Sequence, residues 1–418
     1  MFAELAAEAA KDGAEPTRCR WDASRPASDR MHWINAACTR YAVYLLFPDG
    51  RIEAVDLGAA AEIDAAVQAF SRGLRTVPLP VSPAGEKEGE ACQLSALIFD
   101  PIAPYLADRE HLLISPDSQL NRIPFEALQT EADSDYLLQR YQISYLTSGR
   151  DLLKLETTTP STAPALILAN PNYDTADATA QVASSNDRRS AKLSQLQVGP
   201  LPGTAAEAEA IAPLLPNATI LTEDQATENA LKAAQAPRIL HIATHGFFLA
   251  DVERSEETQN WLAARSVETS FPPADMSIEN PLLRSGLALA GFNARSGSED
   301  GVLTALEVAN LNLFGTQLVV LSACETGLGD IANGEGVYGL RRTFAIAGAE
   351  SQLMSLWLVS DDGTQALMAR YYEKLMSGMG RSEALRATQL EMITEGGTYS
   401  HPYYWASFIL AGDWRPLE

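Results

Sequence analysis

The 418-residue sequence lacks any long apolar run. No stretch approaches the roughly 18 apolar residues that a helix needs to cross a bilayer. The N-terminal sequence MFAELAAEAAKDGAEP is acidic and typical of a helix, and it has neither the basic start nor the apolar centre of a secretory signal peptide. We therefore expect a cytoplasmic protein without membrane contact.

Positive charge is scarce. The chain has 31 Lys and Arg residues against 54 Asp and Glu residues, which gives a formal net charge of −23. Binding to phosphate backbones and to anionic membranes relies on clustered Lys and Arg, and the sequence contains no basic stripe. The composition therefore argues against nucleic acid as a direct partner and favours basic segments of other proteins.

Cysteine is also rare, and none stands in a CxxC pair, which excludes a zinc knuckle and a thioredoxin-type motif. In a long chain without a secretion signal thiols stay reduced, so each remains available as a nucleophile. No cofactor and no metal site is predicted. The cysteines are Cys19, Cys38, Cys92 and Cys324.

The chain divides by composition into three regions. Residues 1–40 begin as an Ala- and Glu-rich helix and continue as a polar linker. Residues 41–160 form a smaller α+β lead-in region, in which Pro48-Asp49-Gly50 joins two apolar runs as a hairpin turn. Residues 161–418 form the main, catalytic part. In the lead-in region we expect a helix at 60–76, a loop at 79–92, and strands at 111–116 and 141–148.

Strands and helices alternate throughout the main part. This alternation predicts an α/β fold with a mostly parallel sheet and helices on both faces. Two polar segments, 171–200 and 249–282, interrupt it, and loops of that length in compact domains are usually functional or disordered. The expected strands are 165–170, 218–221, 238–244, 316–323, 351–358 and 405–412. The expected helices are 204–215, 226–234, 336–347, 362–377 and 381–395.

Two of these strands end in residues that carry chemistry. In an open α/β sheet, ligands bind beyond the carboxyl ends of the strands. The strand 238–244 leads into His245 and Gly246, and the strand 316–323 leads into Cys324. If the strands are neighbours, a thiol nucleophile and an imidazole base face one crevice, with the backbone amides of Gly246 and Cys324 as an oxyanion hole. From the residues alone a second interpretation stays open, in which both side chains only fill the core.

The motifs around these residues resemble a known family. His245 and Gly246 lie in HIATHGFF and Cys324 in LSACETGLG, and segments such as ISPDSQLNRIPFEAL, NPLLRSGLALAG and HPYYWASFILAGDW follow the order found in the CHAT family. These bacterial caspase-like proteins are relatives of caspases, metacaspases and separase. The resemblance covers about residues 41–414 and implies a caspase-like fold and a cysteine endopeptidase with His245 and Cys324 as its dyad. Because the QACxG signature of caspases is absent, their preference for aspartate at P1 is not implied.

Asp361 and Asp362 are the candidate S1 residues, because they follow the strand expected at 351–358. Separase-like relatives read arginine with an acidic residue in a similar place, so the resemblance implies a basic P1 residue. The residues themselves leave another interpretation open, since Asp is a good helix N-cap and a helix is expected to follow.

Three more titratable residues lie near the ends of these strands. Glu325 and Asp330 stand beside Cys324 and are further candidates for reading P1. His241 lies four residues before His245, a spacing that places both on one face of a strand, but no further metal ligand accompanies them. We expect His241 to be a hydrogen-bonded core residue.

Three functions fit this sequence. The first is an endopeptidase that cleaves a protein substrate and is activated by a partner or upstream module, such as a helical-repeat protein. The second is a catalytically silent CHAT interaction or scaffold domain, and the third is a non-peptidase thiol hydrolase. Two interpretations stay open for the arginines in or near the long loops: they are sites of self-cleavage, or they are only solvated loop residues. These arginines are Arg188, Arg189, Arg254, Arg265 and Arg295.

Overall fold

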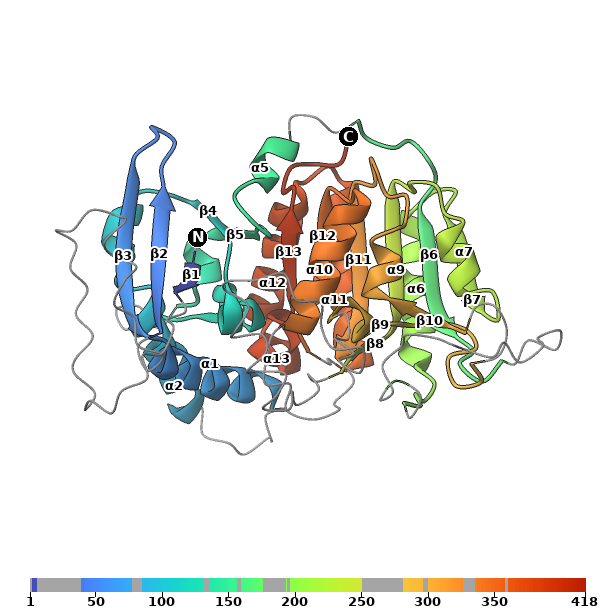
Figure 1. The fold of residues 1–418 in the computed structure, drawn as a ribbon, viewed down its shortest axis with the longest axis horizontal. Coiled ribbons are helices and arrows are strands. Elements are labelled where there is room, and N and C mark those ends of the chain that lie inside the picture. The colour runs from blue at the N-terminus through green and yellow to red at the C-terminus, as the bar shows by residue number, and fades with distance from the viewer. Residues whose placement is uncertain are drawn as a thin grey trace, which may run out of the picture.

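The structure of the chain, a computed structural model, confirms the predicted α/β architecture. Within the residues that it describes, ten strands form one large sheet and three form a small antiparallel sheet (Figure 1). No helix in these ranges is both long and apolar enough to cross a membrane. The described residues are 2–5, 39–76, 85–130, 135–155, 159–175, 193, 196–249, 281–295, 300–325, 335–357 and 360–418.

The large sheet is mostly parallel, with β8 and β11 inside it. Its main row runs β7-β6-β8-β11-β12-β13-β5-β4, and every neighbouring pair in this row is parallel except β12 and β13. The hairpin of β9 and β10 pairs antiparallel with the end of β8. The strands are β4 (His111–Ile114), β5 (Gln142–Tyr145), β6 (Leu166–Pro171), β7 (Thr219–Glu223), β8 (Ile239–Phe248), β9 (Ser285–Ala288), β10 (Val302–Thr304), β11 (Leu318–Glu325), β12 (Ser351–Ser355) and β13 (Phe408–Gly412).

Helices cover both faces of this sheet, as predicted. Alternate strand residues belong to two separate cores, because successive side chains of a strand point to opposite faces. Ile239 and Val320 pack with α6, α11 and α12, whereas Leu240 and Val319 pack with α7, α9 and α10. In Figure 1, α10 crosses the sheet on the viewer's side. The helices are α6 (Pro202–Ile211), α7 (Glu228–Lys232), α9 (Ala305–Val308), α10 (Glu335–Ala347), α11 (Asp361–Met376), α12 (Arg381–Glu395) and α13 (Pro402–Trp405).

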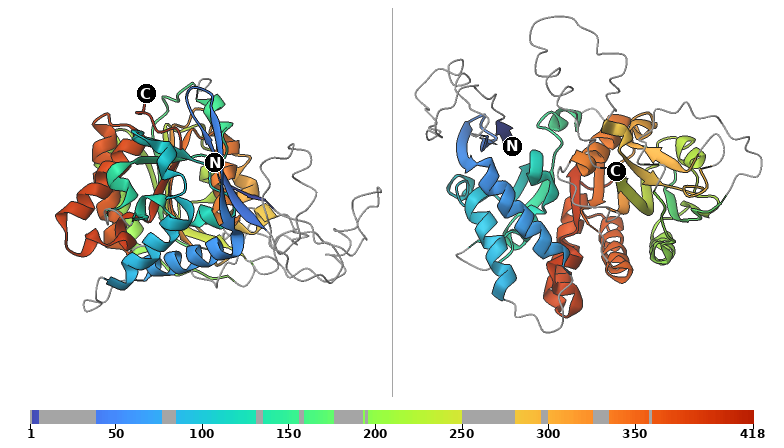
Figure 2. Two further views of the ribbon diagram at one scale, coloured as in Figure 1. Left: turned by 90° about the vertical axis from the view of Figure 1, so that its left-hand side faces the viewer. Right: turned by 60° about the horizontal axis from the view of Figure 1, so that its bottom comes forward.

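The small sheet begins with β1 (Phe2–Leu5), where a helix was expected. That expectation is wrong for these residues, because they pair antiparallel with β2. The other two strands of the small sheet and two packed helices belong to the lead-in region. The predicted hairpin is confirmed as β2 and β3, and α1 and α2 lie side by side (Figure 2). The loop expected at 79–92 is partly wrong, because α2 already begins at Gly85 and buries Leu94 and Ile98 in the core shared with α1. The elements are β1 (Phe2–Leu5), β2 (Arg40–Leu46), β3 (Ile52–Ala59), α1 (Ala60–Arg75), α2 (Gly85–Ile98), α3 (Ala103–Leu106), α4 (Leu137–Arg140) and α5 (Asp151–Lys154).

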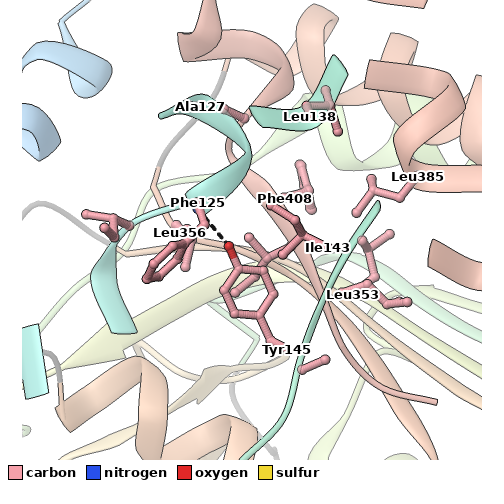
Figure 3. Close-up of a cluster of buried hydrophobic side chains, with 14 of the residues drawn as sticks. Phe125, Ala127, Leu138, Ile143, Tyr145, Leu353, Leu356, Leu385 and Phe408 are labelled. Carbon is pink, nitrogen blue, oxygen red and sulfur yellow. Dashed lines mark hydrogen bonds between the residues drawn. The ribbon is translucent and has the colours of Figure 1, made fainter. Parts of the chain in front are cut away.

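A buried cluster joins the lead-in region to the main sheet (Figure 3). Phe125 and Tyr145 from the lead-in region pack with Leu353 of β12 and Phe408 of β13. The Phe125 backbone amide donates to the Tyr145 hydroxyl at 2.8 Å, and this hydroxyl donates to the Glu126 carboxyl at 2.6 Å. Burial raises the pKa of Glu126 to about 7, while the hydrogen bond from Tyr145 opposes the shift. The lead-in strands β4 and β5 thus extend the main sheet, and the division at residue 160 stays a prediction.

Candidate functional site

β8 and β11 are adjacent parallel strands, paired from Ile239 opposite Leu318 to Gly246 opposite Glu325. His245 of β8 is in register with Cys324 of β11, and Gly246 is in register with Glu325. Neighbouring strands are about 4.8 Å apart, so the backbones of His245 and Cys324 are adjacent. The expectation that these two strands are neighbours is confirmed. The Cys324 side chain lies outside the described residues, and the dyad stays a prediction.

The end of β8 differs from the prediction. The strand was expected to end at residue 244, but it continues through His245 and Gly246 to Phe248. The extension arises because β9 pairs with this part of β8, at Gly246 opposite Leu287, on the edge that β6 occupies further back. His245 is therefore held within a sheet rather than on a loop. The oxyanion role of the Gly246 and Cys324 amides stays a prediction.

The imidazole of His245 is held by a backbone carbonyl. Its Nε2 lies 2.8 Å from the Gly199 oxygen. A carbonyl can only accept a hydrogen bond, so Nε2 carries the proton and Nδ1 of the neutral ring keeps its lone pair. Burial lowers the pKa of His245, and the hydrogen bond to Gly199 opposes that shift. The ring is therefore set up as a neutral base through Nδ1.

Tyr173 supports His245 from another side, and the sequence analysis did not identify it. The two ring centroids are 5.4 Å apart, and the Tyr173 hydroxyl lies 3.0 Å from Thr244 Oγ1. Burial raises the pKa of Tyr173 to about 12, while the hydrogen bond with the His245 backbone opposes the shift. Because Thr244 donates its own proton to the Ala288 carbonyl, Tyr173 is the donor in their contact.

A buried polar network lies one layer below His245 on the same face of the sheet. As predicted, His241 is a core residue: its Nδ1 lies 3.1 Å from the Tyr372 hydroxyl. Its Nε2 lies 3.2 Å from Glu207 Oε1, without the alignment of a hydrogen bond. Glu207 also accepts a 2.8 Å hydrogen bond from Ser322 of β11. The network joins α6 and α11 to the two strands of the site.

Ser322→Ala is expected to lower the free energy of unfolding by about 1.5–3 kcal/mol, because it leaves a buried Glu207 oxygen without its donor. Ser355→Ala is the matched control, since this buried serine of β12 donates only to the neutral Ala323 carbonyl. We expect it to cost about 0.5–1.5 kcal/mol. Denaturant unfolding measures both, and an equal or larger loss for Ser355→Ala contradicts the assignment.

The two candidate S1 aspartates occupy the first turn of α11 and are exposed. The alternative interpretation, that one of them caps the helix, is wrong: Ser360 is the N-cap, and its hydroxyl accepts from the Gly363 amide. Asp361 lies against Gly203, where an added Cβ would come within 2.1 Å of its Cγ. Gly203 is four residues from Gly199, so Asp361 lies near the chain segment that holds His245.

The remaining predicted residues are mostly those that the structure does not describe. The Glu325 side chain, Asp330, Arg188, Arg189, Arg254 and Arg265 lie outside the described residues, as do most of the two long loops. Arg295 is described, and its guanidinium donates to the Leu196 carbonyl and lies over the Phe292 ring. Within the described ranges, no three His, Cys, Asp or Glu side chains come together as metal ligands.

Comparison with known protein families identifies one that matches most of the chain. Residues 88–413 match the CHAT domain family. Tetratricopeptide repeat protein 28 of Mus musculus and that of Homo sapiens are each 24% identical to this chain, over 305 and 309 residues respectively. Each match covers 72% of this chain, which spans only 12% of the length of these relatives.

Solved structures show distant similarity. A separase–securin complex of Saccharomyces cerevisiae has a TM-score of 0.38 at 12% identity, covering 87% of this chain and 21% of that chain. The Arg-specific cysteine proteinase gingipain R has a TM-score of 0.40 at 10% identity, covering 86% of this chain and 76% of that chain.

Proposed function

The chain belongs to the CHAT domain family, and we propose that it is a cysteine endopeptidase with Cys324 as nucleophile and His245 as general base. The observation that carries the proposal is the register of these two residues in the C-terminal parts of adjacent parallel strands. The Gly199 carbonyl adds a specific feature, because it leaves Nδ1 of a neutral imidazole as the nitrogen that can accept a proton.

The reaction follows from these positions. Nδ1 of His245 takes the proton of the Cys324 thiol, and the thiolate attacks the carbonyl carbon of the scissile peptide bond. Backbone amides of Gly246 and Cys324 stabilise the negative oxygen of the tetrahedral intermediate. The imidazolium then returns the proton to the leaving amine, and water hydrolyses the thioester that remains. No metal or cofactor takes part in this scheme.

We propose that the substrate carries a basic P1 residue, arginine over lysine, and that Asp361 binds it. Of the two aspartates, Asp361 is the one that contacts Gly203, on the segment leading from Gly199 into α6. A carboxylate binds guanidinium through paired, charge-assisted hydrogen bonds, whereas an ammonium group cannot match this planar geometry. The chain also carries a formal net charge of −23, which favours the approach of basic segments.

Asp361→Asn is expected to lower kcat/KM for an arginyl peptide by about 10- to 100-fold, because it removes the charge that pairs with the guanidinium. Turnover of a leucyl or methionyl peptide should change far less. Asp362→Asn is the matched control and should leave both rates near those of the wild type. The prediction fails if a peptide library shows equal use of aspartyl or aliphatic P1 residues.

We further propose that the isolated chain is weakly active and that a helical-repeat partner or module raises its activity. The curated relatives are named as tetratricopeptide repeat proteins, and this chain corresponds to a small share of their length. A partner that binds the active arrangement better than the inactive one raises activity by shifting the population.

Labelling of the wild-type chain with a peptidyl-arginyl chloromethylketone tests the proposal against the two alternatives. We expect one adduct per chain, located by peptide mapping at Cys324. A silent scaffold domain forms no such adduct, and a non-peptidase thiol hydrolase reacts with iodoacetamide at Cys324 but cleaves no peptide. Half-buried Cys92 in α2 serves as the internal reference for ordinary thiol reactivity.

A further inference from the structure

The Gly199 carbonyl lies in a segment without regular structure. Residues 196–201 form neither a helix nor a strand, yet Gly199 must stay within hydrogen-bonding distance of His245 for the ring to keep its tautomer. Irregular backbone holds such a position only where other groups satisfy its donors and acceptors. The groups that bind the neighbours of Gly199 therefore decide how the imidazole is held.

The side-chain amide of Asn293 binds both backbone groups of Val198, the residue before Gly199. Asn293 Oδ1 accepts from the Val198 amide at 3.0 Å, and Nδ2 donates to the Val198 carbonyl at 2.9 Å. Nδ2 also donates to the Asp174 carboxylate at 2.8 Å. This pattern fixes the orientation of the amide, because a flipped side chain would place its oxygen against two acceptors.

Asn293 itself stands on a well-packed turn. Its backbone amide donates to the Tyr173 carbonyl at 2.8 Å. The preceding residue, Phe292, is fully buried and packs on Phe247 of β8 with ring centroids 6.0 Å apart. Gly291 opens the turn with a φ of +87°, a conformation that favours glycine, and its amide donates to the Asn172 carbonyl at 3.0 Å. The turn that carries Asn293, and with it the side chain that binds Val198, is therefore fixed against the sheet.

Two separate sets of contacts connect Asn293 to the groups around His245. On one side, Asn293 holds Val198, and Gly199 accepts from the imidazole. On the other, Asn293 binds the carboxylate of Asp174, and the adjacent Tyr173 packs its ring on His245. Gly199 and Tyr173, which contact the imidazole, are therefore each adjacent in sequence to a residue that the Asn293 side chain binds.

We propose that Asn293 is a positioning residue for His245. By holding both backbone groups of Val198, it places the Gly199 carbonyl that keeps the His245 ring in the Nε2–H form, with Nδ1 available as base. The effect on catalysis rests on the proposed peptidase function, whereas the effect on the ring does not. A residue that merely stabilises its turn would change the unfolding temperature and leave the tautomer as it is.

The imidazole ¹⁵N shifts of His245 measure the tautomer directly. We would record them in a Cys324→Ala background, which needs no turnover, and identify the signal of His245 among the five histidines with His245→Gln. Asn293→Ala removes the hydrogen bonds to the Val198 backbone. Asn293→Asp keeps the side-chain volume but has no N–H group to donate to the Val198 carbonyl or to Asp174. Asn312→Ala is the matched control, because this exposed amide donates to Gln235 at 2.9 Å, away from Val198.

We expect a nearly pure Nε2–H form in the reference and in Asn312→Ala, and a mixture of tautomers in both Asn293 variants. With Cys324 restored, Asn293→Ala should lower kcat by about 10- to 100-fold with little change in KM, since binding is kept and orientation is lost. An unchanged tautomer in both Asn293 variants overturns the inference even if the wild type cleaves peptides. A shifted tautomer in a chain that cleaves nothing keeps the inference and removes the peptidase proposal.

Discussion

Cys324→Ala is expected to abolish peptide cleavage, with a loss on the order of 10⁴-fold or more in kcat/KM. The reason is chemical, because the proposed reaction requires the Cys324 thiolate to form the covalent acyl intermediate. The fold should remain, since a small residue replaces a small one beside Ala323, and the register of β11 with β8 depends on backbone hydrogen bonds. Initial rates on an arginyl peptide, with thermal unfolding as the check on folding, measure both statements.

Cys92→Ala is the control for this experiment. Cys92 lies half-buried in α2 of the lead-in region, so its replacement should leave the rate near that of the wild type. Full proteolysis by a folded Cys324→Ala variant would show that another residue is the nucleophile. Loss of activity in both variants would indicate a general effect of cysteine replacement and would also speak against the assignment.

Sequence periodicity predicted most elements of the main sheet within a few residues, because its strands are buried on both faces and read as continuous apolar runs. RILHIAT and TQLVVLSA are examples, and they correspond to β8 and β11. The parallel pairing of these two strands follows from the alternation of strands and helices. The neighbouring positions of His245 and Cys324 on these strands could therefore be predicted from the sequence, although β8 continues past His245 to Phe248.

Features that depend on tertiary contacts could not be read in this way. The extension of β8 to Phe248 depends on pairing with β9, some 40 residues later in the chain, and nothing local marks it. The start of α2 at Gly85 was missed because a stretch rich in Gly and Glu is typical of a loop, whereas packing against α1 makes it helical. In both places tertiary structure overrides local preference.

The groups that support His245 are the least predictable part of the site. Tyr173 and Asn293 are single residues in turns, and neither stands in a pattern that indicates a role. Glu207 lies in the sequence TAAEAEAI, which reads as a helix with exposed glutamates, yet it is buried and bound to Ser322. These residues lie far apart in the sequence, and only the folded chain brings them together around one imidazole.

The pKa of His245 determines the acid limb of the pH profile. Burial lowers this pKa from the ordinary value of 6.5, and the hydrogen bond to Gly199 only partly opposes the shift. His245 accepts a proton only in its neutral form, so the active form persists as pH falls until this lowered pKa is reached. We therefore expect the acid limb of kcat/KM to lie below about 6.5 in the wild type.

His245→Ala is expected to lower kcat/KM by on the order of 10²–10⁴-fold, the usual scale for a lost general base, and to remove this acid limb. The matched control is His111→Ala in β4, because burial also lowers the pKa of His111, while its Nε2 contacts Ser144 at 3.0 Å. That variant should keep both the rate and the limb. Rates from pH 5 to 9 decide the matter: an acid limb that persists in His245→Ala, or that disappears in His111→Ala, would mean that a different group takes the proton from Cys324.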